Sequence, residues 1–171
     1  METWDAIRAR RNVRVYEDRP ISAGDLDRIL EAARRSPSSM NGQPWDFVVC
    51  TDRATLQDLS RTWRYAAHVA GSAATIALVA TEPSDPDERE IVAYDMGQAT
   101  LQMMVVAADL GIGSSHASVD DQGLAREALG LPPERRCVGL IAFGYPADRP
   151  LRPIARPNRR PIEQVVHRER W

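Results

Sequence analysis

Lysine is absent from this 171-residue chain, so all 22 of its cationic side chains are arginine. Any phosphate that the protein binds must therefore be met by a guanidinium, whose planar fork can contact two oxygens at once. Acidic residues slightly outnumber basic ones, which gives a formal net charge of -2 and an isoelectric point near 5.9. This balance argues against a general nucleic-acid binder, because such proteins present a basic face.

Cysteine is nearly as scarce, and its placement excludes two kinds of site. Cys50 and Cys137 are isolated, and without CxxC spacing they support neither a zinc site nor a disulfide framework. Both lie in or beside apolar runs, which predicts small buried hydrophobic side chains. The sequence also lacks an HExxH motif and any cluster of aspartate and histidine, so we expect no metal.

Long apolar runs are missing too. No stretch approaches the roughly 20 apolar residues needed to span a bilayer, and Met1 leads into an amphipathic segment rather than an apolar signal. We expect a soluble, cytoplasmic protein that contacts no membrane. The 43% hydrophobic composition suffices for one well-buried core, and neither a compositional break nor a repeat divides the chain. This predicts a single domain over residues 1–171.

The spacing of apolar residues predicts helices and strands in irregular alternation. A short helix covers 3–11, and a second begins after Ser22, an N-cap with Asp25 at the third helical position. Apolar strands are predicted at 46–50, 74–82 and 138–145, with a helix after Asp52 and a short one at about 121–129. Two helices precede the first strand, and helices of unequal length follow. We therefore expect an α+β sheet sandwiched by helices rather than a regular βαβ repeat.

The longest predicted helix starts after Asp85 and ends at Gly111. Pro86 suits its first position, and acidic residues favour its positive end. Its middle is apolar on more than one side, which is typical of a helix buried all round. In so small a domain, a second subunit would most easily supply that burial. The tail at 146–171 is rich in proline and arginine but ends in an amphipathic segment, and we expect it to embrace the partner.

Residues 36–45, SPSSMNGQPW, carry more hydrogen-bonding side chains than a turn requires. A plain polar turn between helix and strand would account for two or three of them. This segment holds five within eight positions: Ser36, Ser38, Ser39, Asn41 and Gln43. The alternative is a recognition loop whose surplus groups meet a ligand.

Two arginine-rich stretches offer sites for an anion. RRNVR at 10–14 is either a solvated helix end or, if the chain becomes extended after Arg11, a row in which Arg10, Asn12 and Arg14 face one ligand. An arginine pair at 159–160 is either exposed or contributes to the same anion. With the polar loop, these residues describe a ligand that is anionic at one end and planar, with many hydrogen-bonding groups, at the other. Flavin mononucleotide (FMN) fits that description.

The segment GIGSSHAS at 111–118 is interpreted as a loop of small residues. It lacks the GxGxxG spacing of a dinucleotide fold, but its small residues would let backbone amides approach a flat ring. His116 is either a proton donor or, as is commoner for a lone loop histidine, an exposed or structural residue. His68 and His167 have no support as catalysts, and no GxSxG elbow supports a Ser-His-Asp triad.

Taken in order, the motifs RRNVR, SPSSMNGQPWDFVV, DMGQATLQMMVVAADLGIGSS, FGYP and RRPIEQVV resemble the FMN-dependent nitroreductase family, from about residue 7 to residue 166. The resemblance implies an α/β/α sandwich with a mostly antiparallel central sheet. It further implies an intertwined homodimer with two FMN sites at the subunit interface. Residues 146–171 would form a C-terminal extension that embraces the partner subunit.

The resemblance also implies a set of cofactor contacts, some from each subunit. The implied FMN-binding residues are Arg10, Arg11, Asn12, Arg14, Pro37, Ser38, Ser39, Asn41, Gln43, Ser114, Ser115, His116 and Arg159. Those at 37–43 would reach the flavin from the other subunit, and Arg159 would meet the phosphate. Asn12 departs from the commoner serine, which keeps hydrogen bonding but changes reach. The chain lacks the long insertion after residue 80 in which larger members place substrate-covering helices.

The implied activity is that of an FMN-dependent NAD(P)H oxidoreductase with a ping-pong mechanism. NADH or NADPH gives hydride to flavin N5 and is replaced by a nitroaromatic, a quinone or a related acceptor. The flavin carries the chemistry, so no catalytic side chain is expected, although Arg14 would tune the flavin by stabilising its reduced, anionic form. Alternatives are a non-enzymatic flavin-binding or sequestering protein, or a relative that dehydrogenates or dehalogenates a specific metabolite. No 2′-phosphate site is legible that would select NADPH over NADH.

Overall fold

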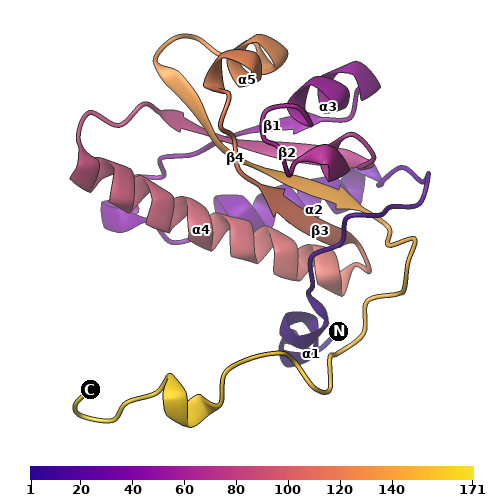
Figure 1. The fold of residues 1–171 in the computed structure, drawn as a ribbon, viewed down its shortest axis with the longest axis vertical. Coiled ribbons are helices and arrows are strands. Elements are labelled where there is room, and N and C mark those ends of the chain that lie inside the picture. The colour runs from indigo at the N-terminus through magenta and orange to yellow at the C-terminus, as the bar shows by residue number, and fades with distance from the viewer.

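Four strands form one antiparallel sheet at the centre of the computed structural model, which describes residues 1–171 (Figure 1). The strand order is β1-β2-β4-β3, so β2 and β4 are central and β1 and β3 are the edges. The strands are β1 (Asp46–Cys50), β2 (Ala74–Thr81), β3 (Gly113–Ala117) and β4 (Arg135–Gly144). The three strands predicted from apolar runs are confirmed, and the one at 74–82 is central, as expected.

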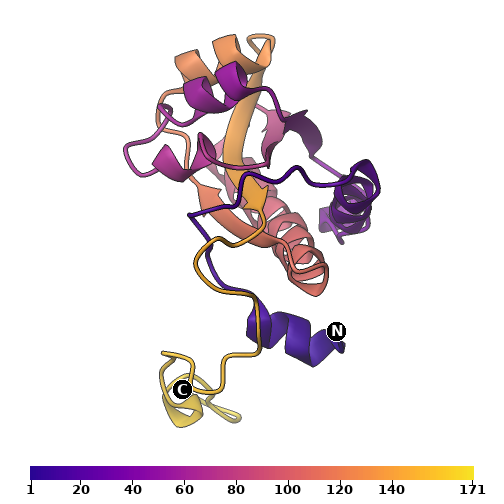
Figure 2. The ribbon, with the colours of Figure 1, turned by 90° about the vertical axis from the view of Figure 1, so that its right-hand side faces the viewer.

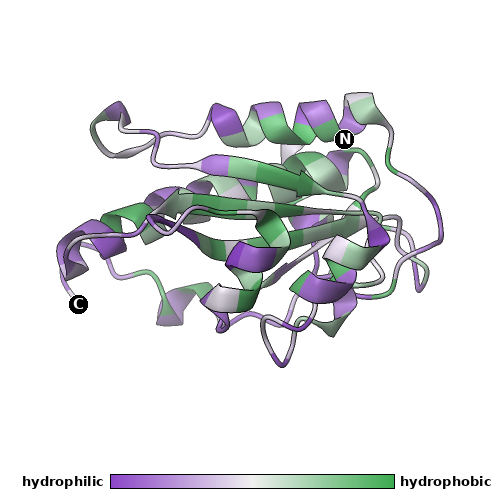
Figure 3. Cartoon of the chain, turned by 90° about the horizontal axis from the view of Figure 1, so that it is seen from above, coloured by the Kyte–Doolittle hydropathy of each residue, from purple (hydrophilic) through white to green (hydrophobic).

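Helices cover both faces of the sheet. On one face lie α2 (Ala23–Arg34) and α4 (Pro86–Asp109), and on the other lie α3 (Arg53–Leu59) and α5 (Gln122–Leu129) (Figure 1). Side chains of β2 alternate between two cores, because successive residues of a strand point to opposite faces: Ile76 packs with α2 and α4, and Ala77 packs with α3 and α5. Figure 3 shows the resulting apolar strands between helices with polar outer faces. The predicted α+β sandwich is confirmed.

Helix starts follow the predicted capping chemistry. Ser22, Asp52 and Asp85 each accept a hydrogen bond from the backbone N–H three residues on, at 3.1, 2.9 and 2.9 Å. Each cap satisfies a backbone donor that the helix leaves unpaired, and such caps stabilise a helix by about 1 kcal/mol. At the other end of α5, Gly130 adopts a left-handed conformation with φ 64° and closes the helix, also as predicted.

Two parts of the chain differ from expectation. The segment at 111–118 is not a loop: Gly113–Ala117 pairs along β4 as the edge strand β3. The tail forms only a short 3₁₀ turn, Ile162–Gln164, and its residues after 151 are exposed in the single chain. Its amphipathic end therefore does not pack against the body of its own chain.

The two ends of the chain leave the sandwich together. The first helix, α1 (Thr3–Ala9), and the tail project on the same side of the body (Figures 1 and 2). The guanidinium of Arg11, just after α1, connects this end of the chain to the tail: it donates to the carboxylate of Asp148 at 2.9 Å and to the carbonyl oxygen of Arg149 at 2.7 Å. Farther along, the backbone N–H of Ile154 donates to the carbonyl oxygen of Arg8 at 3.1 Å.

One side of α4 is uncovered in the single chain, so the predicted burial all round still requires the second subunit that was expected to supply it. Met96 and Met103 are buried against the sheet, whereas Tyr94 and Leu101 are 70% and 56% exposed. Trp4 of α1 is likewise exposed. Uncovered apolar side chains on α1, α4 and the tail are typical of a protein interaction surface. None of the helices has both the length and the apolar character that crossing a membrane requires.

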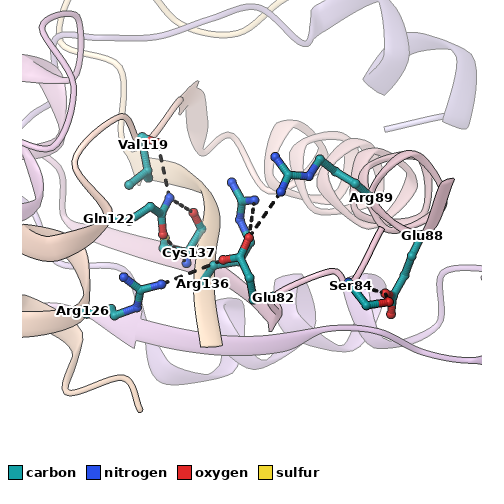
Figure 4. A network of polar contacts seen from close by, with 9 residues as sticks. All are labelled: Glu82, Ser84, Glu88, Arg89, Val119, Gln122, Arg126, Arg136 and Cys137. Carbon is teal, nitrogen blue, oxygen red and sulfur yellow. Dashed lines mark hydrogen bonds and ion pairs between the residues drawn. The ribbon is translucent and has the colours of Figure 1, made fainter. Parts of the chain in front are cut away.

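A cluster of arginines closes one end of the sheet around Glu82, which follows β2. Arg136 of β4 donates to its carboxylate at 3.1 Å, Arg89 of α4 at 3.5 Å, and Arg126 of α5 lies 3.9 Å away (Figure 4). Isolated surface ion pairs contribute little, but here one carboxylate joins three elements to the end of a central strand. This end of the sheet lies opposite the end at which β4 finishes.

Candidate functional site

The segment 10–14 runs in extended form beside the edge strand β3. Asn12 forms a parallel bridge with Ser114, and the backbone N–H of Val13 donates to the carbonyl oxygen of Ser114 at 3.0 Å. Gly113 makes this approach possible, because a Cβ there would lie 2.7 Å from the Cβ of Val13. The extended backbone puts alternate side chains on one side, and Arg10 accordingly reaches Asn12 at 3.5 Å.

Buried polar groups without partners lie beside this segment. Ser114 and Ser115 of β3 are buried, and the hydroxyl of Ser115 has no hydrogen-bond partner. His68, in the 3₁₀ turn Ala67–Val69, is 8% exposed, and neither of its ring nitrogens has a partner. An unpaired buried polar group costs about 1–3 kcal/mol, so such groups at one place point to a ligand.

Electrostatics connect His68 to the arginine segment. Burial lowers the pKa of His68, and the positive charge of Arg14 lowers that pKa further. The imidazole is therefore held in its neutral form, in which one nitrogen donates and the other accepts. The backbones of Tyr65 and Ser115 lie near the ring and act on the pKa of His68 in the opposite direction, by less than burial lowers it, but neither meets a ring nitrogen with hydrogen-bond geometry. His116 also lies near this ring.

The structure thus gathers one group of the predicted site residues at the β3 edge. This group, the strand half-site, contains Arg10, Asn12, Arg14, Ser114, Ser115 and His116. Arg11 instead turns to the tail, where its guanidinium lowers the pKa of Asp148. Sequence reasoning set His68 aside, because a single histidine in an apolar run carries no local signal of a site. Only its missing hydrogen-bond partners reveal it.

The second group of predicted residues lies in the loop at 36–45, the loop half-site. Met40, Asn41 and Gln43 all have positive φ, at 50°, 56° and 48°. For residues other than glycine this left-handed conformation costs roughly 1–2 kcal/mol each. Asn41 and Gln43 are exposed, as are Pro37 and Ser39, and Met40 at the tip is fully exposed.

Contacts within the chain hold the loop in this shape. The hydroxyl of Ser38 accepts a hydrogen bond from the backbone N–H of Gln43 at 3.0 Å. Asp95 of α4 accepts one from the backbone N–H of Ser39, and Gln98 lies 3.5 Å from the carbonyl oxygen of Pro37. The strained conformation is therefore built into the folded chain.

The two half-sites are far apart in one chain. They lie at opposite edges of the sheet, three inter-strand spacings or about 14 Å apart across the strands. Asp46, at the end of the loop, pairs with Val79 of β2, which pairs with Cys137 of β4. On the other side of β4, Ser114 pairs with Phe143. Six positions along β4 add about 20 Å, so the separation is roughly 24 Å. One small ligand cannot touch both half-sites of the same chain.

Arg159 joins neither half-site in the single chain. It is exposed in the tail, and its guanidinium hydrogen-bonds only to the carbonyl oxygen of Asn158, at 2.8 Å. The loop half-site likewise does not reach the segment 10–14 of its own chain. Apart from Arg11, the predicted set is therefore divided into three parts, which one chain alone does not bring together.

Comparison of the sequence with known protein families identifies the family of this chain. The model of the nitroreductase family matches residues 7–70 and 54–145. The chain belongs to the nitroreductase family, and the predicted family and its α+β fold are confirmed.

Two relatives and one solved structure resemble the chain over nearly its whole length. A provisionally named NADH dehydrogenase/NAD(P)H nitroreductase of Archaeoglobus fulgidus is 32% identical over 174 residues, covering 99% of each chain. An FMN reductase (NAD(P)H) of Bacillus subtilis is 26% identical and covers 99% of this chain and 74% of its own. The structure of an FMN-dependent nitroreductase from Clostridium difficile gives a TM-score of 0.83 at 24% identity, covering 97% of this chain and 98% of that one. At that identity the likeness establishes the fold.

Proposed function

We propose that this protein is an FMN-dependent NAD(P)H oxidoreductase that passes hydride through the flavin to a nitroaromatic, a quinone or a related small acceptor. The observation that carries the proposal is the strand half-site, where unpaired buried groups of Ser115 and His68 lie beside a row of arginines. The names of the relatives support the same cofactor and hydride donor.

The chemistry of the strand half-site fits FMN. The flavin ring carries both donors and acceptors, which the hydroxyl of Ser115 and the two nitrogens of neutral His68 would satisfy. Gly113 lets the chain approach closely, and Arg10 offers a guanidinium for an anionic group. Hydride chemistry is supplied by FMN when it is bound, and the protein binds and orients it.

Arg14 would act on the electronic properties of the flavin. It is exposed beside His68, and its charge already acts on the titration of that residue. A guanidinium near the flavin favours the reduced, anionic form over the oxidised one, and so makes the flavin easier to reduce. In this proposal Arg14 tunes the cofactor and transfers no proton.

The site would be completed by a second copy of the chain. The loop that carries Asn41 and Gln43 enters β1 at Asp46. That point is roughly 24 Å from Ser114 of the same chain, so a partner's loop is the one that would reach the same flavin. The uncovered sides of α1 and α4 and the exposed tail supply apolar surface for such a homodimer. The tail would bring Arg159 to the phosphate.

An absorbance spectrum followed by anaerobic titration tests the activity. The purified protein, or the protein incubated with FMN, should show flavin bands in the visible that NADH or NADPH bleaches. An added quinone or nitroarene should then restore the bands, as a ping-pong reaction requires. A protein that binds no FMN would overturn the proposal. One that binds FMN but is not bleached by either nucleotide would be a flavin carrier, and acceptor profiling would separate nitroreduction from dehalogenation or dehydrogenation of a metabolite.

Dilution tests the shared site. If each FMN is held by two chains, dissociation to monomer should release it, and FMN release and loss of dimer should follow one concentration dependence. Flavin fluorescence and sedimentation measure the two events in the same samples. A monomer that keeps its FMN would contradict the shared site while leaving the oxidoreductase proposal intact.

A further inference from the structure

Asp95 is a buried acid without a counter-charge. It lies in the middle of α4, is 1% exposed, and takes part in none of the ion pairs of the chain. Its two carboxylate oxygens lie 3.0 and 3.2 Å from the backbone nitrogen of Ser39 and one lies 3.4 Å from the hydroxyl of that residue. Gln98, one helical turn on, donates to Asp95 at 3.4 Å.

Stability alone does not account for an acid at this position. The neighbouring buried residues of α4, Val92, Met96 and Ala99, are apolar. Burying a carboxylate is costly, and well-packed apolar side chains often replace buried charged groups without loss of stability. The carboxylate must therefore be explained by what it contacts, and that is the loop half-site.

Asp95 contacts the loop at Ser39, the residue just before the left-handed residues Met40 and Asn41. Ser39 begins the 3₁₀ turn Ser39–Asn41, in which Met40 and Asn41 have positive φ. Gln98 reaches the carbonyl oxygen of Pro37, so the two polar residues of α4 hold the loop at 37 and at 39. A charged acceptor binds a backbone N–H more strongly than a neutral one, which suits it to hold a strained turn.

We propose that Asp95 is the positioning residue of the loop half-site: through Ser39 it fixes the turn that presents Asn41 and Gln43 to the flavin bound mainly by the second copy. This inference rests on the proposed function. A loop that is ordered before the flavin arrives loses less conformational entropy on binding, and affinity rises accordingly. Asp95 itself would touch neither flavin nor substrate.

Two measurements on Asp95→Ala and Asp95→Asn test the proposal. In the FMN-free protein, hydrogen exchange at the Ser39 amide should speed up at least tenfold in Asp95→Ala. The Kd for FMN should rise at least tenfold as well. Asp95→Asn keeps one acceptor oxygen and should recover part of both effects, whereas Asp95→Leu, which has a similar shape but no acceptor, should recover neither. Glu90→Ala, on an exposed position of the same helix, should change neither measurement.

Unchanged exchange at Ser39 in Asp95→Ala would overturn the proposal, and so would loss of FMN while that amide stays protected. If the wild-type protein binds no FMN, the proposed function fails, whereas the exchange measurement still tests the action of Asp95 on the loop.

Substitutions at Ser39 provide the test if Asp95→Ala does not fold. Ser39→Pro removes the N–H donor, yet proline suits the first position of a helical turn. The preceding Ser38, at φ −144° and ψ 155°, has the extended conformation that a following proline requires. Ser39→Pro should weaken FMN binding at least tenfold, and Ser39→Ala, which keeps the N–H, should weaken it less. Equal Kd values for Ser39→Pro and Ser39→Ala would overturn the proposal.

Mixed dimers test whether the loop acts across the interface. In a dimer of one Asp95→Ala chain and one Arg10→Ala chain, a loop that serves the partner leaves one site intact and damages the other twice. One FMN should then bind with the wild-type Kd. A loop that serves its own chain leaves no intact site, and no FMN would bind with that affinity.

Discussion

The two half-sites of the proposed flavin site are built in opposite ways. In the strand half-site the backbone is relaxed and paired along β3, while the hydroxyl of Ser115 and the ring of His68 have no partners. In the loop half-site the backbone is strained at Met40, Asn41 and Gln43, while its hydrogen bonds are made within the chain. One half-site has a low-energy backbone and several unsatisfied polar groups. The other has a strained backbone held by internal hydrogen bonds, and among its buried side chains only the hydroxyl of Ser36 lacks a partner.

This difference shows where the free energy of ligand binding would come from. The strand half-site would gain hydrogen bonds that it lacks when empty, so it would provide much of the affinity. In the loop half-site, contacts formed during folding compensate the backbone strain. The loop would therefore add contacts to the ligand without first having to become ordered. Substitutions that damage each half-site should therefore have different consequences, and four predictions test this contrast.

The largest effect is expected at the glycine that allows the strand half-site to form. In Gly113→Ala the new Cβ would lie 2.7 Å from Val13 and force the arginine segment away from β3. Overpacking of this kind costs about 1–3 kcal/mol of folding free energy, and FMN binding should be lost. Chemical denaturation and FMN titration measure the two losses. Gly24→Ala, where a Cβ meets nothing within 4 Å, is the control and should be neutral or slightly stabilising.

The second prediction concerns Arg159 of the tail, which joins neither half-site in the single chain. Arg159→Ala should raise the Kd for FMN by about 10- to 100-fold, because a charge-assisted hydrogen bond contributes roughly 1.5–3 kcal/mol. Arg160→Ala is the matched control on the next residue and should change the Kd little. Equal effects of the two substitutions would indicate a general attraction of the tail for anions in place of a specific contact.

A smaller effect is expected from Arg14, which would act on the flavin more than on its binding. Arg14→Ala should lower the midpoint potential of bound FMN by about 30 mV, equivalent to about 1.4 kcal/mol for two electrons. Spectroelectrochemical titration measures the potential. Arg89→Ala, at the opposite end of the sheet, should leave it unchanged. An unaltered potential in Arg14→Ala would remove this residue from the tuning role.

The smallest effect is a pH dependence of stability in the FMN-free protein. Burial, aided by Arg14, lowers the pKa of His68 below its unfolded value near 6.5. Between these two pKa values the unfolded chain binds more protons, so stability is lost as pH falls below about 6.5, by at most about 1.4 kcal/mol per pH unit. Urea midpoints at pH 7.5 and 5.5 should differ less in His68→Gln than in the wild type or in His167→Gln.

Local chemistry in the sequence predicted much of this structure. The caps at Ser22, Asp52 and Asp85 were predictable because each involves neighbours three residues apart. The apolar strands were predictable because burial on both faces requires continuous apolar runs. The polar surplus at 36–45 indicated a recognition loop, and that role stays a prediction, whereas the left-handed conformation of the loop was not predicted.

Features that depend on distant residues were not predictable in this way. β3, with the sequence GSSHA, lacks branched and aromatic side chains, and it is a strand because β4 pairs with it. The ring of His68 has no partner because of which elements surround it in space. Asp95 carries no local signal either, since its contact with Ser39 spans 56 positions. The residues of a site assembled from distant parts of a chain are therefore recognised from their contacts in the folded structure.

The strand order also dictates when the protein can fold as it is synthesised. β4 lies between β2 and β3 in the sheet, although it is the last of the four strands to leave the ribosome. Until residue 144 has emerged, β2 and β3 each have an unpaired edge, and such edges readily associate with other chains. A nascent chain from which residue 117 has emerged but residue 135 has not is therefore prone to aggregation, and chaperone binding would matter most at that stage.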